Sequence, residues 1–179
     1  MNENGQRVVY RWNKWIPSNV SDFGWKVSHG RIPSKDALRA RGINLPSIVC
    51  SRCGIGTESM NHILFRCQLS KWIWWQVLVW LKLPLSFMPS SFHELVLVVE
   101  NAIGSKMWKK LIEAIVLVTM WGIWKARNEI EFNKRHTSIN RTMEQIKEHR
   151  VVIPGFSAAS SWPAFLYFYI DDPPFKKKT

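Results

Sequence analysis

The feature that most constrains this chain is a cluster of cysteines in its first half. All three cysteines of the 179-residue sequence lie close together, at Cys50, Cys53 and Cys67, and His62 lies between the last two. The spacing is therefore C-x2-C-x8-H-x4-C. Three thiolates and one imidazole are one of the ligand sets that hold zinc in a tetrahedral structural site. The spacing predicts one zinc ion bound by these four residues.

Local geometry supports this prediction at both ends of the cluster. Gly54 follows the second cysteine and can adopt the positive φ that a tight turn around sulfur needs. His62 and Cys67 are five residues apart, which on a regular α-helix separates them by roughly 140° around the axis. Both could not face one metal from such a helix. We therefore expect a helix that begins at or after Thr57, carries His62 and loosens or ends before Cys67.

The cysteines allow two other interpretations besides zinc. Three reduced cysteines can instead pack as small apolar side chains, with His62 exposed to solvent. A disulfide fits poorly, because one cysteine is left over and the polar segment 1–10 lacks the apolar stretch of a secretory signal. If zinc is bound, four protein ligands leave no position for a reactive water, so we expect a structural ion. Its binding would contribute to folding, on the order of 10 kcal/mol.

The charge of the chain favours a polyanionic partner. There are 25 lysines and arginines against 13 aspartates and glutamates, for a net charge of +12. Such an excess is typical of nucleic-acid-binding proteins, although many small basic proteins bind no nucleic acid. The candidate contacts are the cations near the predicted zinc site: Arg52, Arg66, Lys71, Lys35, Arg39 and Arg41. Most of the eleven tryptophans recur at helical spacing, which favours core packing over stacking on bases.

The apolar pattern predicts a mainly α-helical domain with a small Cys3His zinc knuckle. The longest expected helix runs from about Lys106 to Asn133 and is apolar nearly all round between Leu111 and Trp124, so it should be central. Shorter helices are expected from Ser21 to about Gly30, from Ser34 to Arg41, after Ser70 as a cap, from the capping box at residues 91–94, and after Thr137 or Ser138. Residues 162–170 are a candidate edge strand.

No stretch of the sequence is expected to cross a membrane. The most apolar segment, Leu111–Trp124, is too short to span a bilayer and contains Glu113. Together with the missing secretory signal, this predicts an intracellular protein in the nucleus or the cytoplasm.

Several separated motifs then match one pattern. They are Trp12-x2-Trp15-x-Pro17, Phe23-x-Trp25, His29-Gly30-Arg31-Ile32-Pro33-Ser34, Leu38-x2-Arg41-Gly42-Ile43, Cys50-x2-Cys53, His62-Ile63-Leu64-Phe65-x-Cys67 and a tryptophan-rich helix from Trp72. In order and spacing, this stretch resembles the zinc-binding domain found after the reverse transcriptase in plant non-LTR (LINE-type) retrotransposons. A weaker likeness, through Trp121-x2-Trp124-x2-Arg127-Asn128 and Phe132, extends to about residue 150.

The resemblance implies a division of the chain. We expect a loose N-terminus (1–11), a reverse-transcriptase-type zinc-binding domain (12–81), a helical C-terminal extension (82–150) and an irregular tail (151–179). In such polyproteins a polymerase precedes this domain and a ribonuclease H-like domain often follows it. Neither is expected here, so the chain looks like an excised or degenerate fragment.

The expected function is that of a zinc-stabilised module that binds RNA or DNA. The alternatives are a zinc-held scaffold that packed on the adjacent polymerase domain, or a remnant without function. An enzyme is not expected, because no catalytic triad, phosphate-binding glycine loop or open metal site can be assembled. Residues 169–172 match the Y-x-D-D of a polymerase, but they lie after the zinc module and before two prolines, so solvated aspartates in a turn are the better interpretation.

Overall fold

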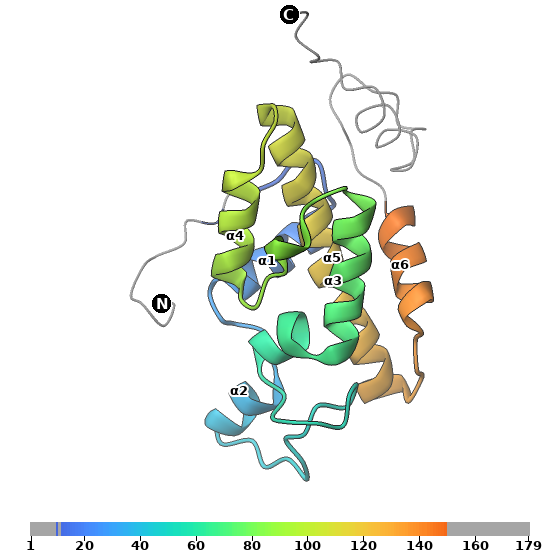
Figure 1. Ribbon diagram of the computed structural model, residues 1–179. Coiled ribbons are helices and arrows are strands. Elements are labelled where there is room, and N and C mark those ends of the chain that lie inside the picture. Colours follow the sequence, from blue (N-terminus) through green and yellow to red (C-terminus); the bar gives the residue numbers. More distant parts are fainter. Residues whose placement is uncertain (1–9, 11, 150–179) are drawn as a thin grey trace, which may run out of the picture.

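The computed structural model describes residue 10 and residues 12–149, and this part of the chain is helical (Figure 1). The elements are α1 (Ser18–Ser28), α2 (Lys35–Ala40), the π-helical turn η1 (His62–Arg66), α3 (Gln68–Trp80), the 3-10 turn η2 (Leu85–Phe87), α4 (Phe92–Asn101), α5 (Lys106–Asn133) and α6 (Ile139–Glu148). The described residues contain no strand beyond one isolated antiparallel bridge between Val49 and Thr57. The predicted mainly α class is confirmed. The candidate strand at 162–170 and the motif at 169–172 lie outside the described residues.

Helix α5 is the centre of the molecule. Its bounds agree with the prediction, and its side chains between Leu111 and Trp124 are buried on nearly every side. Helices α1, α3, α4 and α6 and the turn η1 all pack against it, with α3 and α6 side by side (Figure 1). A helix that is apolar all round needs such neighbours to cover it. Every described helix is too short or too polar to traverse a lipid bilayer.

Serine side chains begin three of the helices. Ser91, Ser105 and Ser138 each accept a hydrogen bond from a backbone N–H in the first turn of α4, α5 and α6. Ser138 rather than Thr137 is thus the cap of α6. In a capping box, the Glu94 carboxylate would accept from the N–H of the N-cap residue, Ser91. Here it accepts from the N–H of Ser90, one residue earlier.

Two predicted helix starts are wrong. Helix α1 begins three residues before Ser21, because the Pro17 carbonyl already accepts from the N–H groups of Val20 and Ser21. Ser21 is buried inside the helix. Helix α3 begins directly after Cys67, and Ser70 lies buried in its first turn, where its hydroxyl donates to the Ile63 carbonyl. Both serines satisfy tertiary contacts instead of capping a helix.

The segment before α1 is held against α5 by one tryptophan and one asparagine. Trp15 is buried, whereas Trp12 is 58% exposed, so only one of these two rings anchors the segment. Asn13 accepts from the Trp15 N–H at 2.9 Å and donates to the Lys110 carbonyl and the Glu113 carboxylate. The buried side chains form a cluster that runs from Trp15 to Ile146. The boundary between the predicted zinc-binding domain (12–81) and the predicted helical extension (82–150) stays a prediction.

Candidate metal centre

The structure brings the four predicted zinc ligands together. The ligand atoms of Cys50, Cys53, His62 and Cys67 all lie within 4.8 Å of one another. The Cys53 Sγ and the His62 Nε2 are 3.3 Å apart. With Zn–S and Zn–N bonds of roughly 2.3 and 2.0 Å, two ligands of a tetrahedral zinc lie about 3.6 Å apart. The cluster therefore has the size and the donor set of one Cys3His zinc site.

The first two cysteines lie in a tight backbone hairpin. The Val49–Thr57 bridge closes it, and the N–H of Cys50 donates to the Gly56 carbonyl at 3.0 Å. At its tip, the N–H of Gly54 donates to the Cys50 carbonyl at 2.9 Å. Gly54 has φ +68°, the left-handed conformation that glycine adopts without strain. The prediction for this glycine is confirmed.

The last two ligands come from a π-helical turn. The Cys67 N–H donates to the His62 carbonyl at 2.7 Å, so the turn closes over five residues instead of four. Residues five apart then lie almost above one another, and His62 and Cys67 can face one ion. Cys67 itself leaves the helix, with φ −59° and ψ 135°. The predicted loosening before Cys67 is thus confirmed, and its form is a π turn.

The thiols of Cys50 and Cys67 act as a pair. A hydrogen bond from Cys50 lowers the pKa of Cys67 to about 7, and the first backbone N–H groups of α3, at Leu69 and Ser70, lower it further against the effect of burial. The same hydrogen bond, with burial, raises the pKa of Cys50 to about 12. One thiol of the pair thus keeps its proton while the other readily becomes a thiolate. A divalent cation would displace that remaining proton.

Arg52 supplies positive charge behind the cysteines. It is 8% exposed, and its Nη1 donates to the Ser70 hydroxyl at 3.0 Å, while its buried Nε has no hydrogen-bond partner. Burial lowers the pKa of Arg52, and the charges of the three cysteine thiolates oppose that shift. Three thiolates around Zn²⁺ leave a net charge of −1, which one guanidinium neutralises. The buried cation therefore fits a zinc–thiolate centre.

Residues 2–74 match the family model described as zinc-binding in reverse transcriptase. Over these residues the chain is similar to that zinc-binding family. No curated protein and no solved structure matches the chain. The match confirms the resemblance for this segment of the chain, and the family and the ligand cluster together fit one structural zinc. The plant LINE-type origin and the weaker likeness beyond residue 81 stay predictions.

A buried ion pair connects the reverse transcriptase zinc-binding segment to α5. Glu58, which is fully buried, accepts from Nε of Arg127 at 3.1 Å and from Nη2 of the same guanidinium. Its other oxygen accepts from the Ser51 hydroxyl at 3.3 Å. Arg127 also lies 5.1 Å from the Trp124 ring and 5.9 Å from the Phe132 ring. The sequence does not predict this pair, although Trp124, Arg127 and Phe132 belong to the motif that extends the family resemblance.

The six cations predicted to contact nucleic acid fall into two groups in the structure, two that are buried and four that are exposed. Arg52 and Lys35 are not available to a phosphate: Arg52 is buried behind the cysteines, and Lys35, 9% exposed, pairs with Glu131 at 3.1 Å and donates to the Val49 carbonyl. Both side chains satisfy internal partners instead, so these two candidate contacts are not accessible on the surface. The other four, Arg39, Arg41, Arg66 and Lys71, are exposed.

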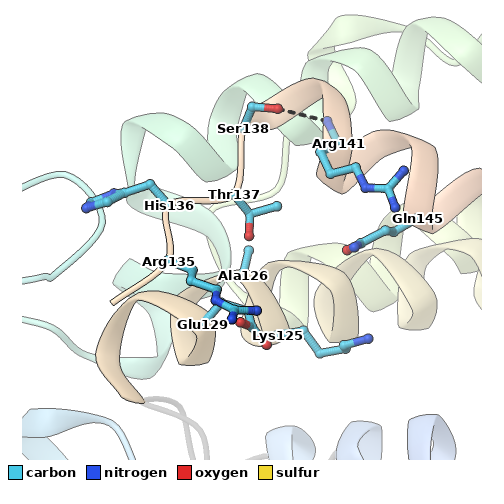
Figure 2. A pocket seen from close by; sticks show the side chains of 9 residues that line it. All are labelled: Lys125, Ala126, Glu129, Arg135, His136, Thr137, Ser138, Arg141 and Gln145. Carbon is cyan, nitrogen blue, oxygen red and sulfur yellow. Dashed lines mark hydrogen bonds between the residues drawn. The ribbon is translucent and has the colours of Figure 1, made fainter. Parts of the chain in front are cut away.

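A second basic surface lies outside the family match, where α5 meets α6. A hollow of about 490 Å³ is lined there by Lys125, Ala126, Glu129, Arg135, His136, Thr137, Ser138, Arg141 and Gln145 (Figure 2). Three of these side chains are permanent cations and one is a carboxylate. Sequence reasoning missed this surface because its residues lie on two helices and the loop between them.

Proposed function

We propose that the reverse transcriptase zinc-binding segment and the helices around it form a nucleic-acid-binding module. The observation that carries the proposal is the position of its exposed cations. Arg66 and Lys71 flank the ligand Cys67, so the zinc site holds the backbone on which they stand. Arg39 and Arg41, at the end of α2, add two further exposed charges. With a net charge of +12, such side chains attract phosphates.

In this proposal zinc organises the backbone and takes no part in a reaction. Four protein ligands leave no coordination position for water or substrate, so the module is proposed to have no enzymatic activity of its own. We propose that it derives from a retrotransposon polyprotein and acts in the nucleus or the cytoplasm. Its partners would be RNA or DNA.

The test is binding of the zinc-loaded full chain to labelled RNA and DNA at several salt concentrations. The slope of log K against log [salt] should be negative, and each neutralised phosphate should make it steeper by roughly 0.7 to 0.9. The variant Arg66→Gln/Lys71→Gln should bind more weakly, and its binding should have a slope that is shallower by about 1 to 2. Lys106→Gln/Lys110→Gln, with the same charge change at the start of α5, is the matched control. Binding that is absent, or that does not depend on salt, contradicts the proposal.

A protein-interaction scaffold is the second candidate. It is favoured by Trp72 and Trp75 on α3, which are 48% and 40% exposed just beyond Cys67. Exposed apolar patches on small proteins commonly mark contacts with other proteins. As a scaffold, the module would have a reverse transcriptase domain as its partner. A stable complex with such a domain by gel filtration, and no salt-dependent binding of nucleic acid, would favour the scaffold.

A further inference from the structure

Helix α3 exposes a stripe of apolar side chains to solvent. Trp72, Trp75 and Val79 are spaced i, i+3 and i+7, so they share one face of the helix. Their exposed fractions are 48%, 40% and 50%. The opposite face, with Ile73 and Val77, is fully buried against the core. We call Trp72, Trp75 and Val79 the α3 stripe.

The two tryptophans of the stripe differ from Trp74, which lies between them. Trp74 is buried, stacks on Phe65 and donates from Nε1 to the Leu64 carbonyl at 2.7 Å. Trp72 and Trp75 contact each other edge to face, with ring centres 5.8 Å apart and planes at 82°. An edge-to-face pair leaves ring surface open on its outer side. That surface can stack on another flat ring.

Positive charge lies beside the stripe on α3 itself. Helix α3 contains no aspartate or glutamate, and its Lys71 is exposed next to Trp72. Arg66 is also exposed, one residue before Cys67, and its Nε donates to the Ser90 carbonyl at 3.4 Å. Aromatic rings beside cations, on a helix without carboxylates of its own, suit a ligand that carries both flat rings and negative charge. Single-stranded nucleic acid is such a ligand.

We infer that the α3 stripe binds the unpaired bases of a single-stranded nucleic acid. Trp72 and Trp75 stack on the bases, while Lys71 and Arg66 contact the phosphates. A duplex keeps its bases stacked inside and offers the rings no base face, so the stripe makes the protein prefer single strands. The inference rests on the proposed function and names the form of nucleic acid that is bound. Because α3 begins directly after Cys67, zinc fixes the position of the stripe.

The test compares one labelled oligonucleotide, alone and annealed to its complement, with the zinc-loaded full chain. We expect Trp72→Ala and Trp75→Ala each to weaken single-strand binding about tenfold, and to leave duplex binding unchanged. Trp72→Phe, which keeps an aromatic face, should restore most of the loss. Trp12→Ala is the matched control, because Trp12 is 58% exposed and lies outside α3. Thermal unfolding of each variant checks that it is folded.

The outcomes separate this inference from the function on which it rests. If the parent protein binds neither strand form, the proposed function fails and the inference fails with it. If the parent binds in a salt-dependent way and the tryptophan variants bind equally well, or lose both forms alike, only the inference is overturned. The stripe is a protein contact if Trp72→Ala abolishes a complex with a reverse transcriptase domain while single-strand binding stays intact.

Discussion

The buried pair of Glu58 and Arg127 allows a quantitative test of how the zinc segment is attached to α5. In the variant Arg127→Met, Glu58 stays in its fully buried position with only the Ser51 hydroxyl and N–H as polar neighbours. Removing one partner of a buried ion pair leaves an uncompensated charge and costs about 3–5 kcal/mol. The variant also lacks the contacts that the Arg127 guanidinium makes with the rings of Trp124 and Phe132.

For a chain of this size, 1 kcal/mol corresponds to a shift of roughly 2–4 °C in the midpoint of thermal unfolding. Arg127→Met should therefore unfold roughly 6–20 °C below the parent. The assay is circular dichroism during heating, with excess zinc so that the metal site stays filled. Methionine has a similar length to the arginine stem and keeps much of its apolar packing, so the shift reports mainly on charge.

Arg141→Met is the matched control. Arg141 pairs with Glu144 at 3.2 Å, but both side chains are 58% exposed, and such pairs contribute only about 0–1 kcal/mol. The double variant Glu58→Gln/Arg127→Met removes both buried charges and should be more stable than the sum of its single variants predicts, by more than about 1 kcal/mol. The reasoning is refuted if the midpoints of Arg127→Met and Arg141→Met agree, or if the two changes at the buried pair are additive.

Three further predictions concern the metal and the core. Cys53→Ser removes one of four ligands, so its unfolding midpoint should fall to that of the chelator-treated parent; a midpoint equal to that of the zinc-loaded parent would contradict a structural ion. Zinc affinity should decrease as the pH falls from about 8 to about 6, because Cys67, with its pKa of about 7, and Cys50, whose pKa is raised, must both be deprotonated to bind. Competition with a chelator at each pH measures this, and an affinity independent of pH would be inconsistent with thiolate ligation. Gly24→Ala should destabilise the protein by about 1–3 kcal/mol in chemical unfolding, because the new Cβ would lie 2.6 Å from the Leu117 side chain; a neutral effect would show that α1 can move away from α5.

Much of this architecture is predictable from local patterns. The ligand set follows from residue types and spacing, and the central position of α5 follows from its apolar run between Leu111 and Trp124. The caps Ser91 and Ser138 sit where polar residues precede amphipathic segments. The incompatibility of His62 and Cys67 with a regular helix also predicted that the backbone must change between them. Each of these signals lies within a few residues of the structure that it specifies.

The remainder depends on contacts between distant residues. Ser70 looks like a helix cap, but its hydroxyl is used by the Ile63 carbonyl and the Arg52 guanidinium. Arg52 and Lys35 look like surface cations because their internal partners are far away along the chain or are backbone atoms. The same limit explains why the pairing of Glu58 with Arg127 was missed. Sequence alone gives a charge at each position and does not say which charges meet.

The pair between Glu58 and Arg127 also orders the events of biosynthesis. All four zinc ligands precede α3, whereas the arginine that neutralises Glu58 is 69 residues further along the chain. At about 5–20 residues per second, the ribosome needs roughly 3–12 s to go from the last zinc ligand, Cys67, to this arginine. Zinc can fill its site during that interval, but Glu58 stays hydrated until α5 arrives. The nascent chain can thus take up its metal before it is able to close its core.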